Sequence, residues 1–377
     1  MIIYADENVP EAETLFAPFG ELRRFAGRSL TAADLRDADA LVVRSVTRVN
    51  AALLSGSPVR FVGSCTIGRD HLDTAFMDAQ GIQWATAPGC NADSVVDYVI
   101  SVLCLDRQRW ASLLSGERQV GIVAFGNVGR RLADRLAGLD IPCCAYDPLL
   151  APAEDARLSS LDAVLACDVL CLHAPLTRGG EYPSFHMLDA AQLSRLPSSS
   201  LVVSAGRGEV VATEELLQLR ELRPDIELAL DVWEGEPGVS RELAGQCLIA
   251  TPHIAGYSLD GKIAGSRAIA EQLQAHCQHR GLKAPAALAA TRLPEPVVEL
   301  SESHGAELLR EAALAVYDPR GDDRRFRESL LADDPAAAFD GLRKHYPERR
   351  EFAYCRYVGE QLDAAGFNLL AALQGGR

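Results

Sequence analysis

The segment from residue 119 to residue 251 consists of short apolar runs separated by amphipathic stretches. Such runs are typical of strands buried on both faces of a parallel sheet, and the stretches between them are typical of covering helices. In chain order the runs are QVGIVAFG, CCAYD, VLCLH, LVVSA, IELALDV and CLIAT. The alternation predicts an α/β lobe with a doubly wound parallel sheet.

The first hundred residues show the same alternation. The runs MIIYAD, ALVVRS, RFVGS and IQWATA predict strands of a second parallel sheet. Apolar residues at helical spacing predict one long helix from about Asp93 to Leu114. A further helical pattern covers Tyr257 to about Gly281 and is expected to pack back on the first lobe.

With 377 residues the chain is long enough for two or three domains. A Pro- and Ala-rich stretch that begins at Lys283 indicates a boundary, and a tail of about 90 residues follows it. We therefore expect three parts.

The formal net charge is -15, which argues against nucleic acid or an anionic membrane as a main partner. An anionic ligand would need a local group of Arg and Lys. The N-terminal sequence MIIYADENVP shows no secretory signal, and no apolar run approaches the roughly 18–20 residues that cross a bilayer. The ten cysteines show no metal-binding spacing. We expect a cytoplasmic protein without a metal site.

The segment GIVAFGNVG joins a predicted strand to a predicted helix and follows the pattern of a dinucleotide-binding loop. Gly126 would let the backbone approach a pyrophosphate, and Gly129 would let the helix pack close to the strand. The helix start at Asn127 and Val128 offers N–H groups to the phosphates. Asp147 ends the next strand about 20 residues on, where a carboxylate binds ribose hydroxyls and repels a 2′-phosphate. This pattern predicts NAD as cofactor rather than NADP.

One position departs from that pattern, because Ala124 stands where its first glycine is expected. A methyl group is tolerated there if φ stays negative, but it can also shift the phosphate loop. Later strands end at His173, Ala174 and Asp231, which we expect to line the nicotinamide side of the crevice.

Three separate residues follow predicted strands and carry complementary chemistry: Arg207 in SAGRGEVV, Glu236 in DVWEGEP and His253 in ATPHIAGY. Strand ends of an open parallel sheet are where such folds bind ligands. Arg207 can hold a substrate carboxylate, and His253 can move a proton. Glu236 can orient the His253 ring and favour its charged form. Together they predict the oxidation of a 2-hydroxy acid, with transfer of a hydride to NAD.

The motifs SAGRG, DVWEGEP and TPHIAGYS resemble those of the D-2-hydroxyacid dehydrogenase family. The segments CTIGRDHLD, APGCNA, VVDYV, ATPHIAGYSLDGK, AVYDPR and RKHYPERRE resemble one branch of it, and the similarity runs from ADENVP to HYPERRE. The resemblance implies oxidation of 4-phospho-D-erythronate to 2-oxo-3-hydroxy-4-phosphobutanoate in pyridoxal 5′-phosphate biosynthesis, with His253 as base. The partners implied are a phosphorylated hydroxy acid and a second copy of the chain.

The fold implied by the resemblance is two Rossmann-like lobes, a flavodoxin-like substrate lobe and an NAD-binding lobe, plus a small C-terminal dimerisation domain. The expected boundaries are 1–92 with 257–284 for the substrate lobe, 93–256 for the NAD lobe and 285–377 for the C-terminal domain. The resemblance also implies site residues. For catalysis they are Arg207, Glu236 and His253; at NAD they are Asp147, Asp231 and Gly256; at the substrate they are Ser45, Thr66 and Tyr257.

Two departures from the family pattern weaken the expected cofactor contacts. Ala174 replaces the usual Thr of His-Thr-Pro-Leu, and Ser204-Ala-Gly-Arg stands where Asn-Ala-Ser-Arg is usual. Each lost hydroxyl or amide would remove about 0.5–1.5 kcal/mol of hydrogen bonding.

A phosphate needs cations or backbone N–H groups. Arg44, beside Ser45 at a strand end, is our first candidate ligand, and Lys262, Arg349 and Arg350 are further ones. Two other functions stay open: another D-2-hydroxyacid dehydrogenase, such as a D-3-phosphoglycerate dehydrogenase, and an NAD-sensing binding protein without turnover.

Overall fold

The computed structural model describes residues 1–291, 293–302, 304–360 and 362–375. The chain forms two compact units, one of residues 1–91 and 258–294 and the other of residues 92–257 and 295–377.

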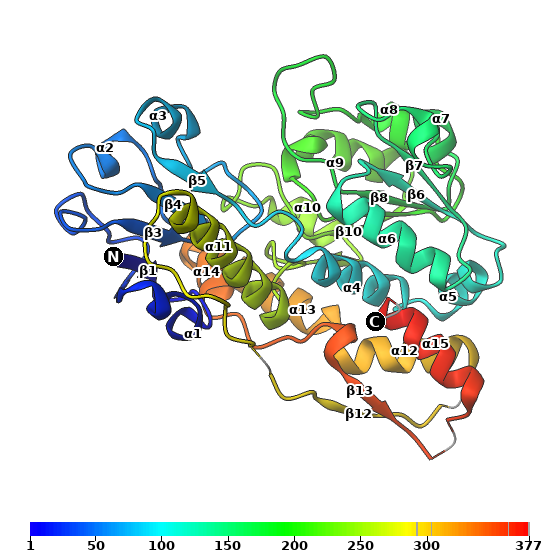
Figure 1. Ribbon diagram of the computed structural model, residues 1–377. Coiled ribbons are helices and arrows are strands. Elements are labelled where there is room, and N and C mark those ends of the chain that lie inside the picture. The colour runs from blue at the N-terminus through cyan, green and yellow to red at the C-terminus, as the bar shows by residue number, and fades with distance from the viewer. Residues whose placement is uncertain (292, 303, 361, 376–377) are drawn as a thin grey trace. The chain divides into compact units, whose positions relative to one another are not determined.

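The first unit contains a five-stranded parallel sheet with the strand order β2-β1-β3-β4-β5. Its strands are β1 (Ile2–Asp6), β2 (Glu21–Phe25), β3 (Ala40–Val43), β4 (Phe61–Ser64) and β5 (Gln83–Ala85). Its helices are α1 (Ala12–Phe16), α2 (Ala51–Leu54), α3 (Thr74–Ala79) and α11 (Leu259–His279). Figure 1 shows α11 lying along this sheet, where it packs on β4. This strand order is that of a flavodoxin-like lobe and confirms the predicted fold.

Two details of the first unit concern the predicted elements. The hydroxyl of Ser258 accepts a hydrogen bond from the Gly261 N–H at 2.9 Å, which fixes the start of α11 close to the predicted position. The sequence analysis missed β2, because ELRRF is a polar strand at the edge of the sheet and none of its residues is fully buried.

The second unit contains a six-stranded parallel sheet with the order β11-β10-β9-β8-β6-β7. Its strands are β6 (Val120–Val123), β7 (Cys143–Tyr146), β8 (Val169–Leu172), β9 (Leu201–Ser204), β10 (Glu227–Leu230) and β11 (Ile249–Ala250). All six coincide with the predicted apolar runs. From β6 the chain adds β7 on one side and β8 to β11 on the other, so the switch point lies between β6 and β8, and an open α/β sheet binds its ligand at such a point.

Helices cover both faces of this sheet. They are α4 (Ala92–Leu103), α5 (Arg107–Leu114), α6 (Asn127–Gly138), α7 (Leu161–Val164), α8 (Ala190–Leu193), α9 (Thr213–Leu222) and α10 (Arg241–Gln246). Alternate strand residues enter two different hydrophobic cores: Val169 and Cys171 one, Leu170 and Leu172 the other. Burial on both faces explains why these strands are apolar without alternation.

The prediction of one continuous helix from Asp93 to Leu114 is wrong. The structure divides it into α4 and α5, because the Asp106 carboxylate accepts a hydrogen bond from the Arg109 N–H at 2.6 Å and caps a new helix.

The C-terminal segment consists mainly of helices. They are α12 (Gly305–Val316), α13 (Pro319–Ser329), α14 (Pro335–Lys344) and α15 (Ala364–Gln374), with β12 (Val297–Glu299) pairing in parallel with β13 (Arg356–Val358). Leu309 of α12 and Leu370 of α15 share one core with α4, α5 and α6 (Figure 1). Phe326 of α13 and Phe339 of α14 join the other core. Residues 295–377 are therefore in one compact unit with the six-stranded sheet.

Within the part of the chain that the structure describes, no helix combines the length and the apolar character needed to cross a membrane.

Candidate active site

Arg207, Glu236 and His253 follow three strands that are neighbours in the sheet. Arg207 lies after β9, Glu236 after β10 and His253 after β11. Because the strands are parallel, these three segments leave the sheet at the same edge. The structure thus places three residues that lie far apart in the sequence after neighbouring strands of the same sheet.

Glu236 and His253 form a hydrogen-bonded pair. The His253 Nδ1 lies 2.8 Å from the Glu236 Oε2, and the other carboxylate oxygen accepts the Trp233 N–H at 2.8 Å. A carboxylate only accepts, so His253 carries its proton on Nδ1 and Nε2 is the nitrogen that can exchange one. The pair has the arrangement of an oriented general base.

Glu236 stays ionised in this arrangement. Burial raises its pKa, but the charge and hydrogen bond of His253, the Trp233 N–H and the charge of Arg343 outweigh burial. The net effect lowers the pKa of Glu236 below its usual value. A permanent carboxylate can stabilise the imidazolium that forms when His253 takes up a proton.

Asp231 holds the loop that carries His253. Its buried carboxylate accepts hydrogen bonds from the Thr251 hydroxyl at 2.7 Å and from the Ile254 and Ala255 N–H groups, each at 2.8 Å. Its backbone oxygen accepts the His253 N–H at 2.7 Å. His253 has φ +57°, a left-handed conformation that costs a non-glycine residue about 1–2 kcal/mol. These four hydrogen bonds maintain it.

Arg207 is positioned by two glycines. A Cβ on Gly208 would lie 2.0 Å from the carbonyl carbon of Trp233. A Cβ on Gly206 would lie 2.9 Å from the carbonyl carbon of His173. Both positions therefore exclude a side chain, and the Arg207 loop packs against the ends of β8 and β10. The Arg207 Nη1 donates to the Gly206 oxygen at 2.9 Å. Arg207 is half-buried.

The loop between β6 and α6 is open at Gly126 and closely packed at Gly129. A Cβ on Gly126 would meet no atom within 4 Å, whereas one on Gly129 would lie 2.2 Å from the Ala124 oxygen. Gly126 is the N-cap of α6, so Asn127 and Val128 open a helix of 12 residues and present N–H groups to this space.

Asp147 follows β7 beside that loop. Its Oδ2 accepts the Phe125 N–H at 2.9 Å, and its Oδ1 accepts the Leu149 N–H at 3.1 Å. Each carboxylate oxygen has a second lone pair, so the group can still accept ribose hydroxyls. Together with the open space at Gly126, these donors and acceptors fit the phosphates and one ribose of NAD.

The sequence analysis expected the methyl group of Ala124 to be tolerated only if the φ angle of this residue stays negative, and the structure differs. The φ of Ala124 is +72°, not negative. Glycine adopts this conformation freely, whereas Ala pays about 1–2 kcal/mol for it. The phosphate loop of this chain therefore contains a strained residue where its fingerprint expects glycine.

The end of β8 carries His173 and Ala174 beside the switch point. Both ring nitrogens of His173 are shielded from solvent and form no hydrogen bond among the described residues. Burial lowers the pKa of His173 to about 4, so the ring is neutral at pH 7. Ala174 is buried. An unpaired polar ring at this position fits a ligand that supplies a polar atom.

The predicted substrate residues lie in both units. Arg44 and Ser45 follow β3, and Thr66 follows the neighbouring β4, so these three leave one edge of the first unit's sheet. The Thr66 hydroxyl lies 2.8 Å from that of Ser64. Gly256 and Tyr257 belong to the second unit, immediately after the loop held by Asp231.

Residues 105–255 match the family described as D-isomer specific 2-hydroxyacid dehydrogenase, NAD binding domain. Residues 292–373 match a domain of unknown function (DUF3410). The chain is 47% identical over 363 residues to the erythronate-4-phosphate dehydrogenase of Cellvibrio japonicus, with 93% of each chain covered. It is 48% identical over 365 residues to that of Pseudomonas aeruginosa PAO1, with 94% of each chain covered.

The chain belongs to the erythronate-4-phosphate dehydrogenase family. This confirms the resemblance to D-2-hydroxyacid dehydrogenases and identifies NAD as the cofactor.

Solved structures support the fold. The NAD⁺-bound 3-phosphoglycerate dehydrogenase of Entamoeba histolytica has a TM-score of 0.58 at 20% identity and covers 78% of this chain and 99% of its own. The D-lactate dehydrogenase of Aquifex aeolicus, complexed with NAD and lactic acid, has a TM-score of 0.59 at 20% identity. The match covers 74% of this chain and 96% of the lactate dehydrogenase chain. About a quarter of the present chain thus has no counterpart in either.

Two arginines of the C-terminal segment lie close to the loop that carries His253, and the sequence analysis interpreted one wrongly and did not single out the other. Arg349 was expected as a phosphate ligand, but this was wrong: it is 6% exposed and donates to the Ser94 and Ala255 backbone oxygens. Arg349 instead fastens the segment after His253. Arg343 was not singled out, although it lies against Tyr257. Both residues belong to the segment RKHYPERRE, but the sequence does not show which of its arginines lies near Tyr257, because tertiary packing decides this.

Proposed function

We propose that this chain catalyses the NAD-dependent oxidation of 4-phospho-D-erythronate to 2-oxo-3-hydroxy-4-phosphobutanoate, in pyridoxal 5′-phosphate biosynthesis. The observation that carries this proposal is the Glu236–His253 pair, which follows two neighbouring strands of an NAD-binding unit. The identity of 47–48% to relatives with this name, over 93% or more of the chain, supports the substrate.

The reaction needs a base for the hydroxyl proton and a holder for the carboxylate. The His253 Nε2 takes the proton from the C2 hydroxyl while the C2 hydrogen leaves as a hydride and the C2–O bond becomes a carbonyl. NAD, when bound, accepts that hydride. Glu236 holds the Nδ1 proton and stabilises the imidazolium, and Arg207 binds the substrate carboxylate through its planar fork.

For the rest of the substrate we propose Ser45, Thr66, Arg44 and Tyr257 as ligands. Arg44 supplies a cation at the end of β3, and the two hydroxyls lie at the same edge. Replacing Arg44 by Ala should raise the substrate KM about 10-fold or more, the effect of losing a hydrogen bond to a charged group. An unchanged KM would remove Arg44 from the site.

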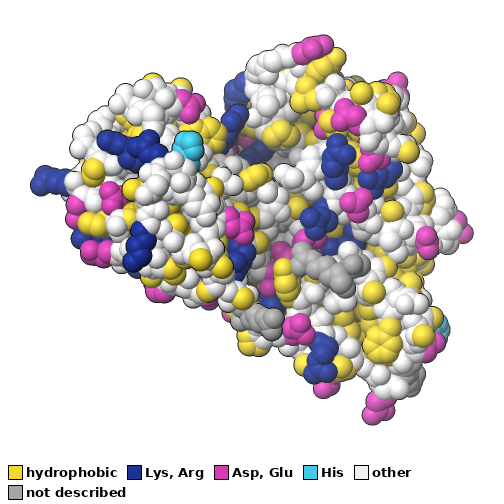
Figure 2. All heavy atoms as spheres, in the orientation of Figure 1, with side chains coloured by type: hydrophobic (Ala, Val, Ile, Leu, Met, Phe, Trp, Pro, Cys, Tyr) yellow, Lys and Arg dark blue, Asp and Glu magenta, His cyan; other side chains and the backbone are white. Residues whose placement is uncertain are grey.

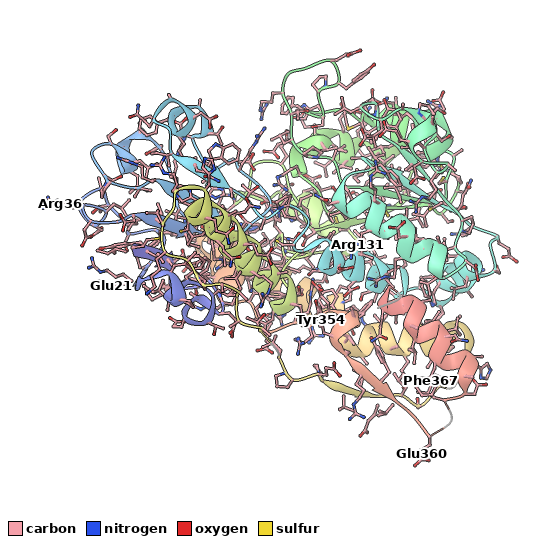
Figure 3. The ribbon with its side chains drawn as sticks, in the orientation of Figure 1. Glu21, Arg36, Arg131, Tyr354, Glu360 and Phe367 are labelled. Atoms are coloured by element: carbon pink, nitrogen blue, oxygen red, sulfur yellow. The ribbon has the colours of Figure 1, made fainter. Side chains whose placement is uncertain are left out.

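We also propose that the enzyme is a cytoplasmic homodimer that associates through its C-terminal segment. Val297 on β12 and Phe367 on α15 are 50% and 53% exposed. Figure 2 shows apolar side chains over the region where Figure 1 places α12 and α15, and Figure 3 labels Phe367 there. Light scattering should give a dimer mass for the purified chain and a monomer mass for Phe367→Glu. A monomeric wild type would contradict this part of the proposal.

The test of the activity is NADH formation by the purified protein with NAD and 4-phospho-D-erythronate, with D-3-phosphoglycerate in parallel. A 2-oxo acid is supplied so that bound NADH does not stop the enzyme after one turnover. We expect preference for the erythronate phosphate and loss of turnover in His253→Ala. Preference for phosphoglycerate would keep the chemistry and change the substrate. No turnover with intact NAD binding would indicate a binding protein.

A further inference from the structure

The C-terminal segment brings a cation to the loop that carries the base. Arg343 lies in the last turn of α14. Its guanidinium carbon is 5.6 Å from the centre of the Tyr257 ring and 5.7 Å from that of Phe339. Tyr257 follows His253 by four positions and packs edge-on against Tyr346 at 5.7 Å. Arg343 is thus held between aromatic rings beside a proposed substrate residue.

Arg343 remains charged in these surroundings. Burial lowers its pKa, but the influence of Tyr257 and the negative charges of Glu236 and Asp231 outweigh burial. The net effect raises the pKa of Arg343. The carboxylates that act on it are therefore those of the catalytic region.

Neither of these carboxylates satisfies the guanidinium. The Glu236 oxygens already accept from His253 and Trp233, and the Asp231 oxygens accept from Thr251 and the backbone after it. None of the ion pairs among the described residues involves Arg343. Its Nε is shielded from solvent and has no hydrogen-bond partner there. A half-buried cation without a carboxylate in hydrogen-bonding contact is costly unless an anion binds it.

Two other arginines of this segment have contacts of their own, although the Arg349 Nη1 is also shielded from solvent without a hydrogen-bond partner among the described residues. Arg349 donates to the Ser94 and Ala255 oxygens and lies 4.3 Å from the centre of the Tyr317 ring. Arg325 is paired with Asp322, and its side chain is 47% exposed. Arg343 differs from Arg325 because no carboxylate of the described residues is in hydrogen-bonding contact with it, and from Arg349 because it lies against Tyr257, a proposed substrate residue.

We propose that Arg343 binds the phosphate group of the substrate, so that the C-terminal segment selects phosphorylated over unphosphorylated 2-hydroxy acids. This inference rests on the proposed function. Arg207 is assigned to the carboxylate next to the reacting C2, and the phosphate lies at the other end of the four-carbon chain. A phosphate carries close to two negative charges, so it can bind a cation in addition to Arg44, and the planar donors of an arginine suit it.

The test compares Arg343→Met with wild type on 4-phospho-D-erythronate and on unphosphorylated D-erythronate. Met keeps an unbranched apolar stem against Tyr257 and Phe339 but removes the charge. We expect kcat/KM for the phosphorylated acid to fall about 10- to 100-fold through KM, because hydrogen bonds to a charged group are lost. The value for D-erythronate should not change. Arg343→Lys should recover part of the loss.

Lys344→Met is the matched control, because Lys344 is the next residue of α14 and is exposed. It should behave like wild type. Inorganic phosphate provides a second probe: its inhibition constant against the phosphorylated substrate should rise about 10- to 100-fold in Arg343→Met. Thermal unfolding and NAD binding establish that each variant is folded.

Two results would overturn the inference. One is an equal loss on both substrates, which would assign Arg343 a structural or positioning role. The other is unchanged inhibition by phosphate in Arg343→Met. If wild type instead prefers D-3-phosphoglycerate, the proposed substrate is wrong, and the same comparison with phosphoglycerate and D-glycerate tests Arg343 separately.

Discussion

Gly126 and Gly129 are predicted to respond to the same added methyl group in opposite ways. Gly126 has φ −82° and open space around the position of a Cβ, so Gly126→Ala should leave folding intact. Reduced freedom of the unfolded chain should even add about 0.4–1 kcal/mol of stability. The methyl would, however, occupy the space that a pyrophosphate must enter. Losing one or two hydrogen bonds to a charged group costs about 1.5–3 kcal/mol, so the Kd for NAD should rise about 10- to 100-fold.

Gly129→Ala is the matched control. Its Cβ would lie 2.2 Å from the Ala124 oxygen, a backbone atom, so α6 must move away from the loop. Such overpacking costs about 1–3 kcal/mol. Urea unfolding measures the stability of both variants, and quenching of NADH fluorescence measures affinity. If Gly126→Ala binds the cofactor as tightly as wild type, the loop is not the phosphate site and the reasoning fails.

Three further predictions concern the Glu236–His253 pair, His173 at the end of β8, and Leu309 in the C-terminal segment. Glu236→Gln should lower kcat about 10²- to 10⁴-fold with unchanged thermal unfolding, because the amide cannot stabilise the imidazolium; unaltered kcat would exclude the pair from proton transfer. The folded-state pKa of His173 is about 4, below the ordinary 6.5, so the unfolded chain binds the extra proton first. Stability should therefore fall as pH drops from 6.5 to 4, by up to about 3 kcal/mol, and His173→Gln should lose this dependence in urea titrations. Leu309→Ala should destabilise the second unit by about 2–5 kcal/mol, because Leu309 is fully buried in the core shared with α4; a variant that unfolds at the wild-type urea concentration would show that the segment is a separate domain.

Much of the sheet architecture follows from local sequence. The six strands of the second unit were predictable because each is largely apolar, and central strands such as β6, β8 and β9 are apolar because they are buried on both faces. The strand β2 was not, because an edge strand can be as polar as ELRRF. The break between α4 and α5 depends on one side-chain cap at Asp106, which helical periodicity does not reveal.

The candidate site divides in a similar way. The placement of Arg207, Glu236 and His253 at one end of the sheet was predictable because each follows a recognisable strand, and the carboxyl ends of parallel strands lie together. Arg343 was not, because nothing in FDGLRKHY indicates that α14 approaches Tyr257. The left-handed φ of Ala124 could not be predicted from the sequence either, because the conformation of the loop determines it and not the type of residue.

The bond between Arg349 and the Ala255 oxygen joins residues that are 94 positions apart. During synthesis the segment after His253 emerges from the ribosome well before Arg349 does. The hydrogen bond that holds this segment can therefore form only after Arg349 has been synthesised. A contact of this sequence separation forms late, because a long loop has to close first. We therefore expect nascent and C-terminally truncated chains to be inactive even where the six-stranded sheet has formed. The cell would then encounter this activity only in completed molecules.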